Sequence, residues 1–327
     1  VPGGGPALWG GSAGLGKARP GLCTPAGEPY IGTLAGRSRE RPGTGQGPGM
    51  IVVTGGAGFI GSNIVAGLND AGIDDILVVD RLGSDDRWQN LARREIADII
   101  PPETMLEVLD AAGDDVEAVI HMGAISSTTE RNVDRIVADN IRTSLDLWTW
   151  CAEAGVPLIY ASSAATYGDG SAGFDDDPNP DALARLRPLN AYGWSKHMFD
   201  RRIVRLAAHS GVAPPRWAGL KFFNVYGPNE YHKGDMRSVV AKLFPKVTAG
   251  ETVELFRSHR PGVADGEQTR DFVWVGDCVD IVLWMLEAPK LAGLFNIGTG
   301  RARTWLDLAG AVGRAVGRDP EIRFIDM

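Results

Sequence analysis

The chain has 327 residues, with 33 basic and 41 acidic side chains and a formal net charge of −8. With this net negative charge the chain lacks the excess of basic residues that binds a nucleic-acid phosphate backbone, so we expect no nucleic-acid partner. No apolar run approaches the roughly 20 residues that cross a bilayer, so we expect no membrane partner. The cysteines, Cys23, Cys151 and Cys278, are scattered and match no metal-ligand spacing. They predict a reducing, cytoplasmic location without disulfides or a metal site.

Residues 1–49 differ in composition from the rest of the chain. They are rich in Gly and Pro, poor in Val and Ile, and without periodicity, which predicts disorder. They lack the apolar core of a secretory signal, and Arg37, Arg39 and Arg41 follow no amphipathic pattern of a transit peptide. Because Met50 directly precedes the first predicted strand, we expect the functional chain to start there, after an upstream extension.

The stretch from residue 50 to 63 is the first with a clear structural pattern. A short β-branched apolar run, typical of a buried parallel strand, is followed by glycines spaced G-x-x-G-x-x-G and then by a helical pattern. Gly55 permits the tight turn, Gly58 the close approach of a pyrophosphate, and Gly61 the close packing of helix on strand. The helix N-terminus offers free N–H groups to phosphates. Alone, this spacing is also compatible with an ordinary strand–turn–helix.

A second buried strand, residues 76–79, ends in Asp80, nineteen residues after Gly61. An acid at this place binds the adenosine ribose in dinucleotide-binding βαβ units, so the two segments together predict a dinucleotide site. Arg81 and Arg87 follow the strand and can hold a 2′-phosphate, whereas Asp80 alone favours a free 2′-hydroxyl. We therefore expect NADP as the cofactor, with NAD as the alternative.

Helical and strand patterns alternate after Asp80, which predicts an α/β fold with a doubly wound parallel sheet. We expect a Rossmann-like domain over residues 50–223 and a smaller substrate-binding part over residues 224–327. The last residues resemble the start of another strand, so we expect this second part to be truncated. The clearest patterns are strands at 116–121, 157–161 and 217–223 and helices at 133–154 and 192–210.

Tyr192 and Lys196 are the first candidates for catalysis. They lie at i and i+4 and therefore share one face of the predicted helix. A free tyrosine has a pKa of about 10, and a nearby ammonium together with a cationic nicotinamide favours the phenolate that can act as a base. Such a pair alone is also typical of a solvated helix surface. Ser163 ends a buried strand, where open α/β sheets bind ligands, and can donate to the reacting oxygen.

These motifs resemble the extended short-chain dehydrogenases/reductases, the NAD-dependent epimerase/dehydratase family. From Met50 to the C-terminus the chain also resembles the ADP-L-glycero-D-manno-heptose 6-epimerases within that family, which act in lipopolysaccharide core precursor synthesis. A homo-oligomer is implied as well. The further stretches that carry the resemblance are Gly123–Glu130, Ala161–Gly168, Phe223–Pro228 with His232-Lys233-Gly234, Arg270–Val273 and Phe295–Gly300.

The resemblance implies how the reaction proceeds. Tyr192 is one acid/base group, Lys196 orients it and contacts the cofactor ribose, and Ser163 donates to the substrate oxygen. Lys233 is a second acid/base group on the other side of the sugar, although by itself it is compatible with a solvated loop lysine. The C6″ carbon of ADP-heptose is oxidised by bound NADP to a transient ketone, rotates about C5″–C6″, and regains the hydride on its other face.

The resemblance also implies a wider binding site, which contains no metal. The implied cofactor contacts are Gly55, Gly58, Phe59, Ile60, Gly61, Asp80, Arg81, Arg87, Met122, Gly123, Ala124, Ile125, Ser126, Asn140, Lys196, Val225 and Lys233. The implied substrate contacts are Ser163, Asn224, Asp235, Lys242, Phe256, Arg257, Ser258, His259 and Arg270.

The chain departs from the family pattern at several places. Met122 replaces an acidic residue, and Asp235 stands where a small hydroxyl residue is usual. The loop 259–268 is enlarged, and the family's final segment, with a substrate-contacting tyrosine, is missing.

Three alternatives remain open. A 4,6-dehydratase requires an Asp-Glu pair where Ala164 and Ala165 stand, and a UDP-hexose 4-epimerase lacks the His-Lys-Gly segment. A non-catalytic NADP-binding regulator commonly loses the Tyr or the Lys of the helix pair, and this chain keeps both.

Overall fold

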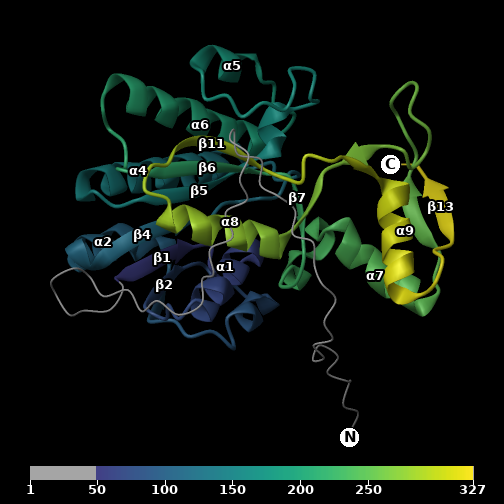
Figure 1. Ribbon diagram of the computed structural model, residues 1–327, viewed down its shortest axis with the longest axis horizontal. Helices are drawn as coiled ribbons and strands as arrows, with labels where there is room; N and C mark the ends of the chain where they lie inside the picture. Colours follow the sequence, from purple (N-terminus) through teal and green to yellow (C-terminus); the bar gives the residue numbers. More distant parts are fainter. Residues whose placement is uncertain (1–48, 327) are drawn as a thin grey trace, which may run out of the picture. The chain divides into compact units, whose positions relative to one another are not determined.

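A seven-stranded parallel sheet dominates the computed structural model, which describes residues 49–326 (Figure 1). The predictions for the extension before Met50 lie almost entirely outside these residues. The sheet order, β3-β2-β1-β4-β5-β6-β11, reverses direction between β1 and β4, which confirms the predicted doubly wound α/β fold. The strands are β1 (Met50–Thr54), β2 (Ile76–Val79), β3 (Asp98–Ile100), β4 (Val116–His121), β5 (Leu158–Ser163), β6 (Trp217–Phe222) and β11 (Ala292–Ile297).

Helices cover both faces of this sheet, which is why its central strands are apolar without alternation. One face packs against α1 (Phe59–Asp70) and α8 (Val275–Glu287), which lie side by side (Figure 1). The other face packs against α2 (Met105–Ala112), α4 (Thr143–Ala154) and α6 (Ala191–His209).

The predicted helix over residues 133–154 is helical but not uniform. A π-helical turn, η4 (Val137–Arg142), separates α3 (Val133–Ile136) from α4. Such turns often occur at functional sites because they redirect a side chain. Here the turn carries Asn140.

The C-terminal part contains three small two-stranded pairings and its own apolar core. Helices α7 (Val239–Ala249) and α9 (Trp305–Val316) pack on the parallel pair β8 (Val253–Phe256) and β13 (Ile322–Ile325). The segment between these elements returns to the main sheet as α8 and β11, so the sheet draws on residues from both sides of position 223. The other pairs are β7 (Asn224–Tyr226) with β10 (Phe272–Trp274), and β9 (Thr269–Arg270) with β12 (Arg303–Thr304).

Short helical segments complete the chain. They are η1 (Asp86–Asn90), η2 (Pro102–Thr104), η3 (Gly113–Asp115), η5 (Ala164–Tyr167), α5 (Pro180–Arg185) and η6 (Tyr231–Met236). Within residues 49–326, no helix is both long and apolar enough to cross a membrane.

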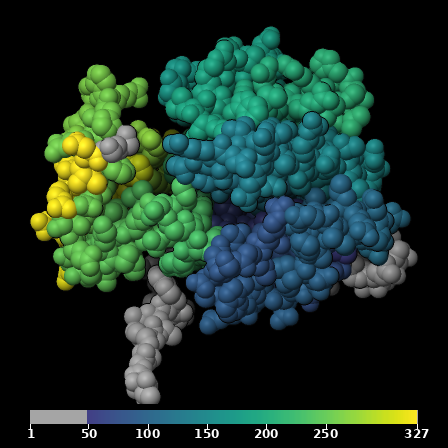
Figure 2. All heavy atoms as spheres, turned by 180° about the vertical axis from the view of Figure 1, so that it is seen from behind, coloured from purple at the N-terminus to yellow at the C-terminus, as the bar shows by residue number. Residues whose placement is uncertain are grey.

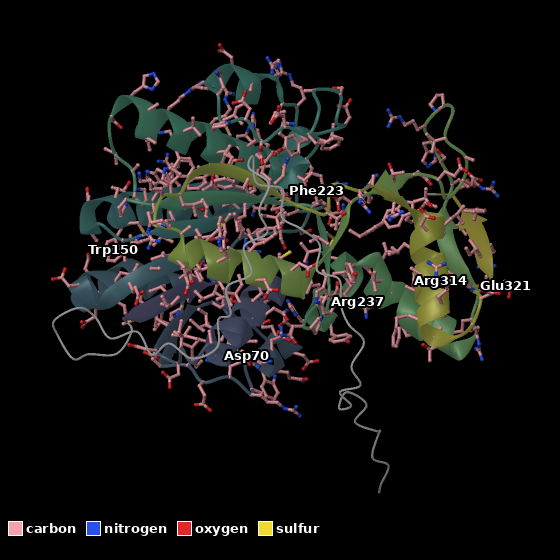
Figure 3. All side chains as sticks on the ribbon, in the orientation of Figure 1. Asp70, Trp150, Phe223, Arg237, Arg314 and Glu321 are labelled. Carbon is pink, nitrogen blue, oxygen red and sulfur yellow. The ribbon has the colours of Figure 1, made fainter. Side chains whose placement is uncertain are left out.

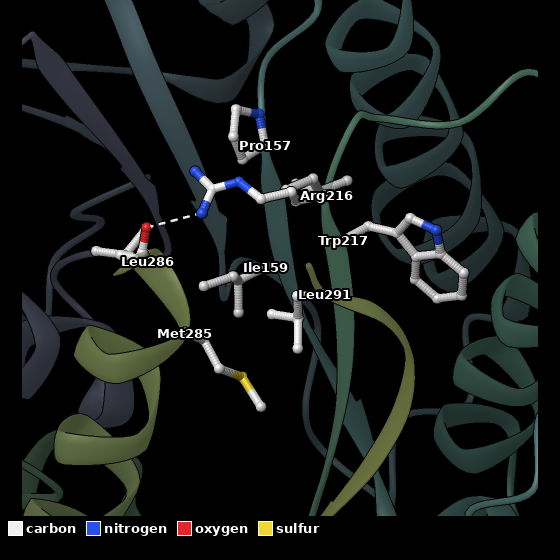
Figure 4. Close-up of a pocket in the computed structure, with 8 residues that line it drawn as sticks. Pro157, Ile159, Arg216, Trp217, Met285, Leu286 and Leu291 are labelled. Carbon is white, nitrogen blue, oxygen red and sulfur yellow. Dashed lines mark hydrogen bonds between the residues drawn. The ribbon is translucent and has the colours of Figure 1, made fainter. Parts of the chain in front are cut away.

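The N-terminal and C-terminal ends of the parallel strands carry different kinds of residues. At the N-terminal ends of β5 and β6, a small apolar pocket lies beside Arg216, whose Nη1 donates to the carbonyls of Leu286 (3.0 Å) and Ala288 (2.8 Å) (Figure 4). This contact satisfies carbonyl groups at the end of α8. The predicted site residues follow the opposite, C-terminal ends of the strands.

Candidate active site

The glycine-rich turn after β1 has the geometry of a phosphate-binding loop. Gly55 has a φ of 64°, and its carbonyl accepts from the Gly58 N–H at 3.0 Å. A Cβ on Gly61 would lie 2.1 Å from the Gly55 carbonyl oxygen, so only glycine permits this approach of α1 to the turn. The face of the molecule seen in Figure 2 has a hollow, and purple atoms from the first folded residues lie at the floor of this hollow.

Asp80 ends β2 beside this turn, as predicted for a ribose-binding acid. Its Oδ2 accepts from the Ala57 N–H at 2.9 Å and its Oδ1 from the Arg81 N–H at 2.8 Å. Burial raises the pKa of Asp80, and these two hydrogen bonds and the charge of Arg87 oppose that rise. The carboxylate therefore joins the glycine-rich turn to the end of β2.

The two arginines predicted to hold a 2′-phosphate lie in different surroundings. Arg87 approaches Asp80 Oδ1 to 3.8 Å and also pairs with Asp85 at 2.7 Å. Arg81 turns to Glu103 at 2.7 Å and to Asp139 at 3.4 Å. Arg87 is thus the arginine whose guanidinium lies beside Asp80.

The loop after β4 is held from two sides. The Gly123 N–H donates to Thr54 Oγ1 at 2.9 Å, while Asn140 accepts from the Ile125 N–H at 2.8 Å and donates to its carbonyl at 3.0 Å. Asn140 also donates to Ser195 on α6 at 3.0 Å. Its amide therefore binds protein groups and positions the loop. The remaining predicted loop residues, Met122, Ala124 and Ser126, are partly or fully exposed.

A buried histidine network lies beneath this loop, and sequence reasoning missed it. His121 Nδ1 lies 2.6 Å from Thr54 Oγ1, and its Nε2 lies 2.8 Å from Ser144 Oγ. Because Ser144 donates to the Asn140 carbonyl, its oxygen accepts from the His121 Nε2–H. Burial lowers the pKa of His121 to about 3, so the imidazole is neutral.

The predicted Ser-Tyr-Lys set is assembled where β5 ends and α6 begins. The Tyr192 side chain lies beside Ser163, which acts to lower the pKa of the Tyr192 hydroxyl. The start of α6 approaches the segment after β5 closely, and this approach requires glycine at position 193, because a Cβ there would lie 2.7 Å from the Ala165 carbonyl oxygen. Lys196 is 3% exposed, one turn further along α6.

Burial has the largest effect on the pKa of Tyr192. Burial raises the pKa of Tyr192, and the hydrogen bond from Ser163 opposes the rise only in part. Burial also lowers the pKa of Lys196 to about 8, against the attraction of Asp200. The prediction that Lys196 and a cationic nicotinamide together favour the phenolate concerns the site with cofactor bound, and it stays a prediction.

Asp200 and Lys221 form a second buried network that sequence reasoning missed. Both side chains have no exposed surface, and Lys221 Nζ lies 2.8 Å from Asp200 Oδ2. Asp200 also accepts from Tyr160 at 2.8 Å and from Ser162 at 2.7 Å. One signal was available, since Asp200 lies at i+4 from Lys196 on the same buried face of α6.

Lys233 does not extend freely into solvent. Its ammonium lies 5.4 Å from the centre of the Phe59 ring at the start of α1. Burial lowers the pKa of Lys233, against the attraction of Glu230. Glu230 accepts from the Ser238 N–H and, at 2.6 Å, from its hydroxyl, which ties the Lys233 segment to the start of α7. The structure therefore places Lys233 against the predicted cofactor loop, near Ile60.

The predicted substrate contacts nearest the sheet follow β6 and η6. Asn224 is exposed and donates to the Asp271 carbonyl at 3.1 Å, with Val225 beside it on β7. The Asp235 carbonyl accepts from Lys242 at 2.5 Å, so these two predicted residues contact each other. Phe223 precedes this group at the end of β6 (Figure 3).

The other predicted substrate contacts gather at the ends of β8 and β9. Arg257 pairs with Asp265 at 3.2 Å, and the Ser258 N–H donates to the same carboxylate. Arg270 lies 5.9 Å from the Trp305 ring centre. Phe256 and His259 are exposed beside them.

Asp271 is a further polar residue that the sequence did not reveal. Its carboxylate accepts from the Thr299 N–H at 2.9 Å, from the Thr299 hydroxyl at 2.7 Å and from the Gly300 N–H at 2.8 Å. It thereby fixes the loop after β11. Across residues 49–326 we find no group of three or more His, Cys, Asp or Glu that could hold a metal ion.

The model of the NAD dependent epimerase/dehydratase family matches residues 51–298. The chain belongs to this family. The ADP-L-glycero-D-manno-heptose-6-epimerase of Nitratidesulfovibrio vulgaris is 51% identical over 281 residues, which cover 85% of this chain and 84% of that enzyme. These matches confirm the predicted family resemblance.

Solved structures of epimerases have the same fold. The ADP-L-glycero-D-manno-heptose-6-epimerase of Helicobacter pylori is 28% identical, with a TM-score of 0.71 over 85% of each chain. A UDP-glucose 4-epimerase of Thermus thermophilus in complex with NAD is 28% identical, with a TM-score of 0.65 over 84% of this chain and 85% of that one.

The residues of this epimerase/dehydratase family member fit a nicotinamide dinucleotide. The turn at Gly55, the contact at Gly61 and the acid at Asp80 form a glycine-rich cradle of the kind that binds a pyrophosphate and ribose. Arg87 adds positive charge beside Asp80.

Proposed function

We propose that this chain epimerises ADP-D-glycero-β-D-manno-heptose at C6″ to ADP-L-glycero-β-D-manno-heptose, with a bound nicotinamide dinucleotide. The observation that carries the proposal is the pairing of two acid/base sites in one chain. The first is Tyr192 with Ser163 beside it at the end of β5, and the second is Lys233 against Phe59 at the glycine-rich turn. The similarity to heptose epimerases supports the choice of substrate.

The bound nicotinamide supplies the hydride acceptor and donor. Tyr192 holds its phenolic proton in the chain alone, because burial raises its pKa, so it is set to donate a proton to a substrate oxygen. Ser163, beside Tyr192, donates a hydrogen bond to the same substrate oxygen. Lys196 is too buried to act as an ordinary surface lysine. We propose that it contacts the cofactor ribose and orients Tyr192.

Lys233 suits a second proton-transfer role. Burial lowers its pKa, so its neutral amine is more accessible than that of a solvated lysine. It is held by η6 beside α1, whereas Tyr192 is held by α6 beside β5. Two acid/base groups on separate elements suit an epimerase, because protons must be transferred to and from the same substrate oxygen in two orientations.

The proposal is tested by the turnover of Tyr192→Phe and Lys233→Met with ADP-heptose. Each variant should lose about 100- to 10,000-fold in kcat, the usual contribution of a general acid/base group. Cofactor binding should change far less. A substrate analogue with a C6″ aldehyde should still be reduced or oxidised by each variant. Lys290→Met, at an exposed lysine, is the matched control and should keep normal turnover. Full epimerase turnover in Lys233→Met would remove Lys233 from the mechanism.

We further infer a preference for NADP over NAD. Arg87 beside Asp80 supports this, since a guanidinium at the end of β2 can accompany a 2′-phosphate. Isothermal titration should show that Arg81→Ala/Arg87→Ala weakens NADP binding specifically. Of the single variants, Arg87→Ala should account for most of the loss, because Arg81 pairs with Glu103 and Asp139. Equal affinities for both cofactors in the unmodified protein would contradict this inference.

We also propose that residues 50–223 chiefly bind the cofactor, that residues 224–327 chiefly bind the sugar nucleotide, and that the protein is a homo-oligomer. Substitutions at Arg257 and Arg270 should then raise KM for substrate while leaving cofactor affinity unchanged. Sedimentation at micromolar concentration tests the assembly, and a purely monomeric species would contradict it.

A further inference from the structure

Three asparagine side chains join the glycine-rich turn and the start of α1 to residues 228–233, the segment that carries Lys233. Asn90, the last residue of η1, lies with its Nδ2 2.9 Å from the Ala57 carbonyl and 3.2 Å from the Asn229 carbonyl. The same nitrogen lies 3.3 Å from His232 Nδ1. Its two N–H groups therefore face acceptors on both segments at once.

Two further bonds join the start of α1 to the same segment. Asn63 donates to the Phe59 carbonyl at 2.8 Å and to the Pro228 carbonyl at 3.0 Å. Asn229 donates to Ser62 at 3.1 Å and has a φ of 71°. Asparagine is among the few non-glycine residues that adopt this left-handed conformation readily.

We propose that Asn90 is a positioning residue that holds the Lys233 segment in its catalytic place against the cofactor loop. This inference rests on the proposed acid/base role of Lys233. Asn90 also follows Asp80 and Arg87 on the connection after β2, so the same side chain links the adenosine end of the cofactor site to the catalytic lysine.

The need for such a link follows from the chemistry of lysine. Its side chain is long and flexible, and a proton-transfer group displaced by about 1 Å can lose on the order of 100-fold in rate. Within η6 itself, Gly234 has a φ of 52° and interrupts the helical geometry, so the segment lacks a continuous helix to hold it. Hydrogen bonds from Asn90 and Asn63 supply that constraint from outside.

The test is the steady-state kinetics of Asn90→Ala, alone and combined with Lys233→Met. Asn90→Ala should lower kcat about 10- to 100-fold, with KM for substrate and Kd for cofactor within about threefold of normal. In the Lys233→Met background the same change should lower kcat less than about twofold, because Asn90 acts through that lysine.

Asn69→Ala is the matched control. Asn69 also bridges α1 and the β2–β3 connection, with bonds to the Ile73 carbonyl and to both backbone groups of Glu95, but it lies at the other end of α1. It should keep kcat within about twofold. If Asn90→Ala fails to fold, Asn63→Ala provides the same cycle through the Pro228 bond.

The outcomes separate this inference from the proposed function. Normal kcat in Asn90→Ala, or an equal loss in both backgrounds, would overturn the positioning role while Lys233 stays catalytic. Full turnover in Lys233→Met alone would overturn both.

Discussion

Replacing Lys221 with methionine removes the cation from a fully buried ion pair. Lys221 Nζ donates to Asp200 at 2.8 Å and to Thr166 at 2.9 Å, and neither charged side chain has exposed surface. Methionine keeps the apolar length of lysine, so the change tests the charge more than the volume.

The structure sets the size of the expected loss. Removing one partner of a buried pair costs about 3–5 kcal/mol, because the other charge is left uncompensated. Asp200 keeps its hydrogen bonds from Tyr160 and Ser162, which places the expected loss near the lower end, at about 3 kcal/mol. Asp200→Asn in addition removes the uncompensated charge and should recover at least about half of the loss.

Urea unfolding at pH 7, followed by tryptophan fluorescence, measures these differences. Lys290→Met, at the exposed surface, should change the free energy of unfolding by less than about 0.5 kcal/mol. A loss below about 1 kcal/mol in Lys221→Met, or a double variant no more stable than the single one, would refute the argument.

Two further predictions concern the buried histidine and the glycine-rich turn. His121 has a folded pKa of about 3, against about 6.5 when unfolded, so the unfolded chain binds its proton first as the pH falls. The contribution of neutral His121 to the free energy of unfolding is complete above pH 6.5, and about 2 kcal/mol of it is lost by pH 5. Urea unfolding above pH 6.5 and at pH 5 should show no such loss in His121→Gln. An equal loss of stability in His121→Gln and in the unmodified protein would contradict the prediction. Gly61→Ala forces a Cβ against the Gly55 carbonyl and should weaken cofactor binding at least about tenfold by titration, unlike Gly310→Ala on α9, where the nearest atom is a flexible arginine end.

Local patterns determined much of this protein from the sequence. The strand at residues 50–54 and the helix from Phe59 follow from β-branched runs, glycine spacing and a 3.6-residue period, which act between near neighbours. Tyr192 and Lys196 share a helix face for the same reason, because their relation is set by helical geometry alone. Asp80 is predicted at the cofactor site because it ends a second buried strand nineteen residues after Gly61, at the usual spacing of a ribose-binding acid.

Tertiary structure decided what depends on distant contacts. No local signal shows that β11 joins the sheet beside β6, since its backbone partners lie 75 residues earlier in the chain. A π-helical turn aims Asn140 at Ile125 within a stretch that reads as one long helix.

The electrostatics and the links between loops were likewise set by packing. The pKa of Tyr192 is raised because burial removes its hydroxyl from water, and burial is a property of the whole fold. Asn90 resembles any polar loop residue in the sequence, yet it bridges the cofactor turn and the segment of Lys233 because two distant segments converge on it. Sequence patterns identified the chemical groups, and long-range packing determined their charge states and how they are held.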